Sequence, residues 1–309
     1  MSKTNLISIV GAGHSGSTLL DLLLGMNSEI TSVGEISHWD EYLKENRLCS
    51  CGDPTLECQF WSDITRDWYA QIENNQDKEQ KTNTSSYSIS GVANRVRHRI
   101  SLAATMLLPM HKYSSLLYKL NPLAYKRAKN IARLYDLILA RSGASIVCDS
   151  SKSVFRFRLL HALRPRSSKA LFLTRDGRAV AASHYRRQGR APKASARSWR
   201  FINIYTELML RTIDKSSYMH VRYEELCREP EKTLKKICEF LGCSFHPEML
   251  TFSDVKPHNI GGNRMRMAGV SEIQEDLKWQ TVLSSAQLIE FNRAAGKINE
   301  RLLGSYLQR

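Results

Sequence analysis

The chain of 309 residues is long enough for one large domain or two ordinary ones, with a sizeable hydrophobic core. Its residues are 42% hydrophobic and 24% charged, which is typical of a globular protein and excludes a fibrous or wholly disordered chain. No apolar run is long enough to cross a bilayer, and the N-terminus lacks the pattern of a signal peptide. We therefore expect a soluble, cytoplasmic protein with no transmembrane segment.

The net charge of +15 is concentrated in the middle of the chain. Residues 91–213 hold 25 basic and only 4 acidic side chains, whereas residues 1–90 carry a net negative charge. A region this basic usually indicates an anionic ligand, a nucleic acid or an anionic surface. The composition therefore favours an enzyme that acts on an anionic substrate or a protein that binds polyanions.

The first predicted elements are a strand and the helix that follows it. Residues 5–12 form a β-branched run that stops at glycine, as buried parallel strands do, and residues 19–24 form an apolar helix. Further strands are predicted at residues 144–149, 170–174 and 218–222, and further helices at residues 122–140, 177–187, 194–213 and 230–241. This alternation predicts an α/β fold with a parallel sheet flanked by helices on both faces.

A long insertion, at about residues 49–121, separates the first strand–helix unit from the next one. Its pattern is partly helical, and residues 76–90 are polar and rich in Ser, Thr and Asn, which indicates a flexible loop. No internal repeat is visible. We therefore expect one domain that spans residues 1–309 and contains this insertion.

Three of the seven cysteines, Cys49, Cys51 and Cys58, lie close together in the sequence. They could hold a metal ion or form a local disulfide bridge. Zinc normally takes four ligands, and the sequence shows no evident fourth ligand near them. We therefore expect no metal site in this chain.

The glycine-rich segment 11–18, Gly-Ala-Gly-His-Ser-Gly-Ser-Thr, follows a strand and opens a helix, which is the setting of a phosphate-binding loop. Nucleotide triphosphatases carry a lysine where this chain has Ser17, so ATP or GTP hydrolysis is not expected. The loop predicts a P-loop-type sheet whose backbone amides bind an oxyanion. The residues expected to bind it are Gly13, His14, Ser15, Gly16, Ser17 and Thr18.

This loop resembles the 5′-phosphosulfate loop of sulfotransferases that use 3′-phosphoadenosine 5′-phosphosulfate (PAPS). Residues 171–183 resemble the 3′-phosphate segment of the same family, in which Arg175 follows a strand and Ser183 lies eight residues further on. The run Val-Arg-Tyr-Glu-Glu-Leu is similar to the segment whose tyrosine, here Tyr223, lies near the adenine. Together with Asp-Ser-Ser-Lys ending at Lys152, these motifs span most of the chain.

The resemblance is closest to the bacterial small-molecule, carbohydrate and tyrosylprotein branches of the family. It implies transfer of the sulfuryl group from PAPS to a hydroxyl or an amine of a small-molecule or glycan acceptor. Adenosine 3′,5′-bisphosphate is released, and no metal is required. The insertion at residues 49–121 is then expected to line the acceptor site or to form a lid over it.

The resemblance also implies roles for individual residues. Glu35 takes the place of the general base, for which we expect a pKa raised by partial desolvation. His38 is the alternative base, or it orients the acceptor. Lys152 is expected to contact the sulfuryl group, and His14 stands where relatives usually have a Lys or Arg that assists the departing phosphate.

A second glycine-containing loop near the C-terminus carries Arg264 and Arg266, which the resemblance places over the 3′-phosphate. The alternative function is a polyanion- or nucleic-acid-binding protein built on a degenerate phosphate-loop fold. Such proteins usually interleave basic and aromatic residues. In this chain the basic run at residues 186–190 instead follows the 3′-phosphate segment, so we expect no nucleic-acid partner.

Overall fold

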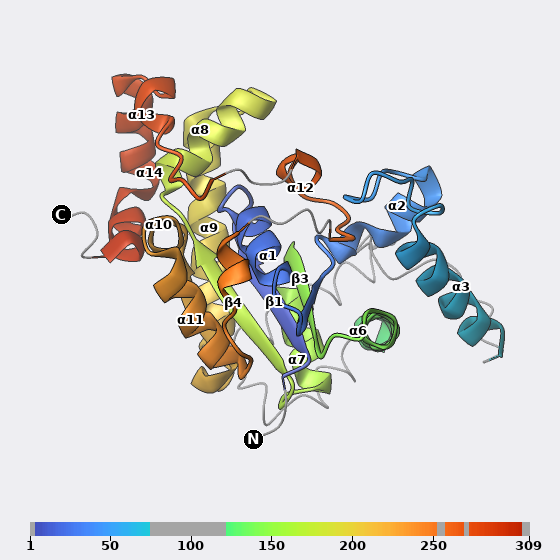
Figure 1. Ribbon diagram of the computed structural model, residues 1–309. Coiled ribbons are helices and arrows are strands. Elements are labelled where there is room, and N and C mark those ends of the chain that lie inside the picture. Colours follow the sequence, from blue (N-terminus) through green and yellow to red (C-terminus); the bar gives the residue numbers. More distant parts are fainter. Residues whose placement is uncertain (1–3, 75–121, 252–256, 269–271, 305–309) are drawn as a thin grey trace.

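A parallel sheet forms the centre of the molecule in the computed structural model, which describes residues 4–74, 122–251, 257–268 and 272–304 (Figure 1). Its strands are β1 (Leu6–Gly11), β2 (Ile30–Ser32), β3 (Ile146–Lys152), β4 (Ser168–Thr174) and β5 (Tyr218–Arg222). They are ordered β2-β3-β1-β4-β5, and each neighbouring pair is parallel. The predicted α/β fold is confirmed.

Helices surround this sheet. The longer ones are α1 (Ser17–Gly25), α3 (Gln59–Asn74), α6 (Pro122–Ser142), α7 (Val154–Leu163), α8 (Gly177–Gln188), α9 (Pro192–Leu210), α11 (Pro230–Leu241) and α14 (Ser285–Leu303). The shorter ones are α2 (Trp39–Glu45), α10 (Tyr223–Arg228), α12 (Met265–Ala268) and α13 (Trp279–Val282), with 3₁₀ turns at Ile36–His38, Lys215–Ser217 and Pro247–Leu250. Figure 1 shows α8, α13 and α14 grouped at one end of the molecule and α2 and α3 at the other.

Both faces of the sheet are buried, which explains why the strands are almost continuously apolar. Ile7 and Ile9 of β1 share a core cluster with the leucines of α1 and the apolar side of α11. Leu6 and Val10 point the other way because successive strand residues alternate, and they join clusters formed with α6, α7 and α9. The expectation of helices on both faces is therefore confirmed.

β2, α7 and α14 are among the elements that the sequence analysis does not predict. β2 contains only three residues, too few for a periodic signal, and it is formed by pairing with β3 from Ile146 to Cys148. α7 begins after Ser153, whose side chain accepts a hydrogen bond from the Arg156 amide. α14 begins with a capping box between Ser284 and Gln287, a signal that the sequence does contain.

Close packing at the start of α8 fixes the helix that carries Ser183. Gly177 lies between Trp199 of α9 and Phe291 of α14, and a Cβ at this glycine would come within 2.6 Å of the Phe291 ring. Asn299 of α14 also accepts a hydrogen bond from the Gly177 amide. The C-terminal helix therefore holds α8 in place against α9.

The insertion expected at residues 49–121 is only partly described. Its first portion forms a tight turn containing the cysteines, followed by α3. Residues 75–121, which include the loop expected at residues 76–90, lie outside the described residues. The predicted lid or acceptor-site role of this segment stays a prediction.

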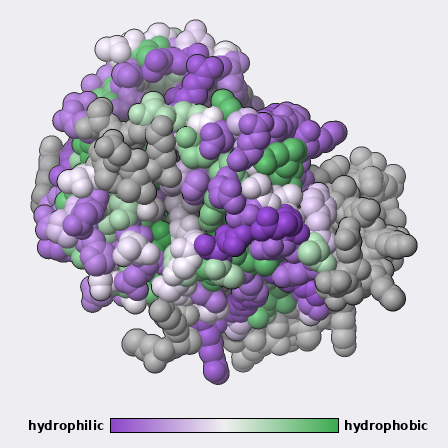
Figure 2. Space-filling view, turned by 45° about the vertical axis from the view of Figure 1, so that its right-hand side comes forward, coloured by the Kyte–Doolittle hydropathy of each residue, from purple (hydrophilic) through white to green (hydrophobic). Residues whose placement is uncertain are grey.

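The surface carries mostly hydrophilic side chains on the face shown in Figure 2, with smaller hydrophobic areas between them. Within the described ranges, none of the helices combines the length and the hydropathy that a membrane span requires.

Candidate functional site

The loop between β1 and α1 is shaped to bind an anion. Gly16 is the N-cap of α1 and has a left-handed backbone with a φ of 89°. A side chain at this position would overlap the ring of Tyr223, so the close approach of the tyrosine also requires glycine. The first amides of a helix have no partner within the helix, and the helix dipole adds positive potential there. The loop at residues 13–18 therefore offers a backbone site for a phosphate or sulfate group.

His14 stands at the centre of this loop, also with a positive φ of 61°. Its Nδ1 lies 3.3 Å from the Ser183 Oγ, and its ring packs edge-on against His184 with centroids 4.5 Å apart. Burial, together with the charges of His184, Arg187, Lys152 and Arg175, lowers the pKa of His14 to about 4. His14 is therefore neutral near pH 7, and its ring can act as a hydrogen-bond donor but not as a cation.

Arg175 follows β4 and reaches back to the glycine loop. Only 8% of its side chain is exposed, and its Nη1 donates to the His14 carbonyl oxygen at 3.1 Å. Its Nη2 donates to the Asp276 carbonyl oxygen at 3.0 Å, and its guanidinium lies 4.4 Å from the centre of the Tyr223 ring. The structure thus brings together Arg175, His14, Ser183 and Tyr223, which the sequence motifs had placed in one site.

A small cavity of about 40 Å³ opens beside Arg175. Its lining residues are Arg175, Ala179, Ala182, Ser183, Arg186, Arg187, Asp276, Lys278 and Trp279. Four of these side chains are basic and one is acidic, so the cavity favours an anion. Arg187 and Lys278 were not expected here from the sequence, although Arg187 lies four residues after Ser183, one turn further along α8.

The carboxylate of Glu35 and the ammonium of Lys152 form an ion pair on the other side of the loop. The exposed fractions of the two side chains are 17% and 20%. Lys152 ends β3 with a φ of 66°, and His38 Nε2 lies 3.6 Å from the second oxygen of Glu35. His38 also hydrogen-bonds through Nδ1 to Glu41 at 3.0 Å. Three of the candidate catalytic residues are therefore in direct contact.

The expected pKa shift of Glu35 is wrong in direction. Burial does raise the pKa of this carboxyl, but the hydrogen bond from His38 and the charge of Lys152 together outweigh burial. The pKa of Glu35 therefore lies below its usual value, and the carboxylate is ionised at neutral pH. Glu35 and Glu41 raise the pKa of His38 in turn.

A segment from the far end of the chain connects the two sides of the loop. The Glu35 amide donates to the Ile260 carbonyl oxygen at 2.6 Å. A Cβ on Gly262 would lie 3.4 Å from the Thr18 Oγ1 and 3.6 Å from the Glu35 Oε1. Thr18, in the first turn of α1, and Glu35 therefore flank the same glycine. Sequence reasoning missed this contact because more than two hundred residues separate its partners.

Arg264 and Arg266 do not line the cavity beside Arg175. Arg264 is exposed, and Arg266 donates hydrogen bonds to the Tyr42 hydroxyl and to the carbonyl oxygens of Leu48 and Asn259. Their expected contact with a 3′-phosphate stays a prediction. Arg266 instead joins the loop at residues 257–268 to the region around α2.

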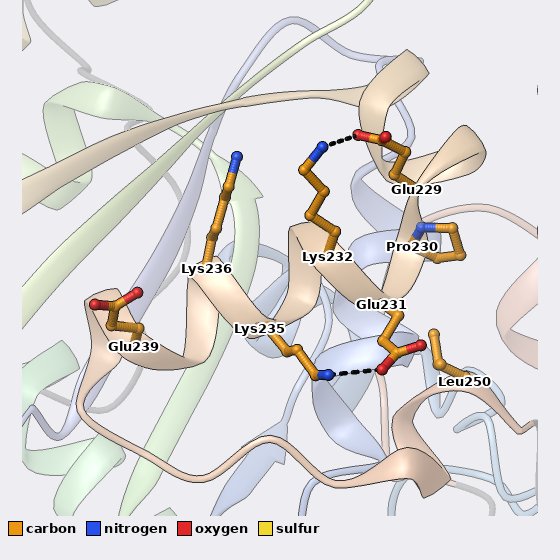
Figure 3. A pocket seen from close by; sticks show the side chains of 8 residues that line it. All are labelled: Glu229, Pro230, Glu231, Lys232, Lys235, Lys236, Glu239 and Leu250. Carbon is orange, nitrogen blue, oxygen red and sulfur yellow. Dashed lines mark hydrogen bonds and ion pairs between the residues drawn. The ribbon is translucent and has the colours of Figure 1, made fainter.

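A larger hollow, of about 710 Å³, lies on the outer side of α11 (Figure 3). It is lined by residues of that helix, by Glu229, which precedes the helix, and by Leu250. Two of its lysines form exposed ion pairs, Lys232 with Glu229 and Lys235 with Glu231. None of the residues of the glycine loop lines it. This hollow is an open surface groove and is not the candidate site.

Comparison with protein families gives one match. Residues 7–247, well over half of the chain, match the model of the sulfotransferase family. No curated protein sequence matches the chain significantly.

The solved structures that are similar to this fold include two sulfotransferase domains. The sulfotransferase domain of the olefin synthase from Synechococcus PCC 7002 has a TM-score of 0.52 and 20% identity, with 96% of each chain covered. The sulfotransferase domain from the curacin biosynthetic pathway has a TM-score of 0.53 and 19% identity, with 96% of this chain and 98% of that chain covered. At these identities the likeness shows that the fold is shared.

Proposed function

The chain belongs to the sulfotransferase family, and we propose that it transfers the sulfuryl group of PAPS to a hydroxyl, or an amine, of a small-molecule or glycan acceptor. One observation carries the proposal. The anion-binding loop and the half-buried Glu35, which is paired with Lys152, flank the same glycine, Gly262, so donor and base groups meet at one point. Adenosine 3′,5′-bisphosphate is the second product.

The donor is held by groups that are already in place. The backbone amides at residues 13–18 bind the 5′-phosphosulfate, and the basic cavity beside Arg175 and Ser183 binds the 3′-phosphate. Tyr223, packed on Gly16 and on the Arg175 guanidinium, provides the apolar surface for the adenine. Arg175 exchanges its contact with Asp276 for the 3′-phosphate when the donor binds.

The chemical step is an in-line transfer. The acceptor oxygen or nitrogen forms a bond to sulfur while the bond between sulfur and the 5′-phosphate oxygen breaks. Glu35 takes the proton that the acceptor loses, and His14, as a neutral donor, hydrogen-bonds the departing phosphate. No divalent cation enters this scheme, because Lys152 and the loop amides stabilise the developing charge.

The Glu35–Lys152 pair explains how a carboxylate of low pKa becomes a useful base. Lys152 pairs with Glu35 in the free protein and turns to the sulfuryl oxygens when the donor arrives. Glu35 then loses the charge of Lys152, which lowers its pKa together with the hydrogen bond from His38, while its burial, which raises the pKa, remains. Donor binding thus activates the base. His38 stays beside Glu35 to orient it or to relay its proton.

The class of ligand is tested by thermal shift with adenosine 3′,5′-bisphosphate against ATP, AMP and duplex DNA. At about a hundred times its dissociation constant, a ligand that binds only the folded state adds about 2.7 kcal/mol to the free energy of unfolding. We expect this stabilisation from the bisphosphate alone. Equal or greater stabilisation by DNA would instead support the polyanion-binding alternative.

A further inference from the structure

Three cysteines that lie close together in the sequence meet a histidine from the far end of the chain. They are Cys49, Cys51, Cys58 and His258, and their ligand atoms all lie within 4.8 Å of one another. The Nδ1 of His258 is 3.2 Å from the Cys58 sulfur and 3.9 Å from the Cys49 sulfur. His258, 200 residues after Cys58, supplies the fourth ligand that the sequence did not reveal.

These separations suit tetrahedral coordination. Zinc binds cysteine sulfur at about 2.3 Å and histidine nitrogen at about 2.0–2.1 Å, which places neighbouring tetrahedral ligands about 3.5–3.8 Å apart. The two measured sulfur–nitrogen distances fall on either side of that range. A disulfide would use two of the cysteines and leave the third thiol and the imidazole without a function. We propose that Cys49, Cys51, Cys58 and His258 bind one zinc ion.

The cysteine ligands are held by a tight turn. The Gly52 amide donates to the Cys49 carbonyl oxygen at 3.1 Å, and the Cys49 amide donates to the Asp53 carbonyl oxygen at 2.8 Å. Gly52 has a φ of 106°, a conformation that side chains rarely allow. Cys49 and Cys58 are fully buried, whereas Cys51 and His258 are partly exposed.

The histidine ligand is oriented by the first turn of α3. The ring of Phe60 stacks on the ring of His258, with centroids 4.8 Å apart and an interplanar angle of 10°. The indole nitrogen of Trp61 donates to the His258 carbonyl oxygen at 2.8 Å. All four ligands are therefore positioned by contacts other than the metal, as expected for a preformed site.

The zinc ion has a structural role. All four positions are filled by protein ligands, so none remains open for a substrate or a water molecule. The ion joins the cysteine turn to the segment that supports Glu35, since Ile260, two residues after His258, accepts the hydrogen bond of the Glu35 amide. The Ser50 amide strengthens the same junction by donating to the Asn259 carbonyl oxygen at 3.1 Å. Binding releases the thiol protons to solvent.

The site is tested on the full chain, purified under reducing conditions, by elemental analysis and by cobalt(II) titration after removal of bound metal. We expect one equivalent of zinc as purified. Cobalt should give the visible d–d bands of a tetrahedral ion and a thiolate-to-cobalt charge-transfer band, and one equivalent of zinc should abolish both. Cys58→Ser and His258→Asn should each weaken metal binding by more than about tenfold, whereas Cys243→Ser, outside the cluster, should not.

Two results would overturn the proposal. One is a reduced wild-type chain that takes up neither cobalt nor zinc, and this readout does not depend on any variant folding. The other is a native disulfide among Cys49, Cys51 and Cys58, detected by peptide mapping without reduction. Neither result bears on the donor site, whose thermal shift with adenosine 3′,5′-bisphosphate is measured separately.

Discussion

The two sides of the glycine loop are built in different ways. On the donor side, backbone amides, the end of β4 and one face of α8 supply the contacts, and Arg175 is tied to the loop itself. On the acceptor side, Glu35, Lys152 and the segment at residues 257–268 come from separate parts of the chain and meet through side chains. The donor side is thus fixed by the sheet, whereas the acceptor side depends on an ion pair and on a remote segment.

The largest effect is expected on the acceptor side, from Glu35→Gln. Glutamine keeps the shape and much of the hydrogen bonding but cannot accept a proton, so kcat should fall about 10²–10⁴-fold. The affinity for adenosine 3′,5′-bisphosphate should stay the same because Glu35 does not line the cavity beside Arg175. The measurement is kcat at saturating donor together with bisphosphate titration.

Two further variants test whether the loss of kcat is specific to Glu35. Glu45→Gln removes an exposed carboxylate on the same stretch of chain and should leave kcat unchanged. His38→Ala should lower kcat less than Glu35→Gln, because His38 acts through the carboxylate. If Glu35→Gln retains nearly normal turnover while His38→Ala is inactive, His38 is the base and the assignment to Glu35 fails.

The next effect belongs to the donor side. Arg175→Ala should weaken binding of adenosine 3′,5′-bisphosphate by about 1.5–3 kcal/mol, because a charge-assisted contact to the 3′-phosphate is lost. Adenosine 5′-phosphosulfate lacks that phosphate, so its affinity should hardly change. Isothermal titration with both ligands measures the difference.

The matched control is Arg197→Ala, which removes an exposed arginine of α9 and should change neither affinity. Equal weakening of both ligands by Arg175→Ala would mean that the arginine supports the loop through the His14 carbonyl oxygen and does not select the phosphate.

The same contrast explains what the sequence could and could not predict. Donor-side residues lie in continuous motifs at strand ends, so the positions of His14, Arg175, Ser183 and Tyr223 could be related before the structure was known. The hydrogen bond between Glu35 and Ile260, and the approach of His258 to the cysteines, depend on the path that the chain takes after α11. No local sequence pattern predicts that path. The low pKa of Glu35 has a different cause, because the hydrogen bond from His38 and the charge of Lys152 outweigh burial, and the sequence does not show how these side chains are oriented.

The smallest effect is expected from His14 on the donor side. It is a dependence of the stability of the protein on pH. Its pKa in the folded protein is about 4, lowered first by burial and then by neighbouring charges, whereas an unfolded histidine titrates near pH 6.5. Below about pH 6.5 the unfolded chain therefore binds a proton that the folded chain does not. The contribution of His14 to the free energy of unfolding is complete above that pH and is lost as the pH falls toward 4.

His14→Asn should remove this dependence. Asparagine tolerates the left-handed backbone of residue 14 and keeps a hydrogen-bonding side chain, so the loop should retain its shape. Between about pH 7.5 and pH 5 the wild type should lose about 1 kcal/mol more stability than the variant, a figure reduced from the full linkage value because the ring is only partly buried. Other histidines whose pKa is lowered by burial, such as the buried His161, contribute equally to both proteins and cancel in the comparison. Urea unfolding at the two pH values measures the difference. Parallel losses in both proteins would mean that folding does not lower the pKa of His14 and that its ring is charged at pH 5.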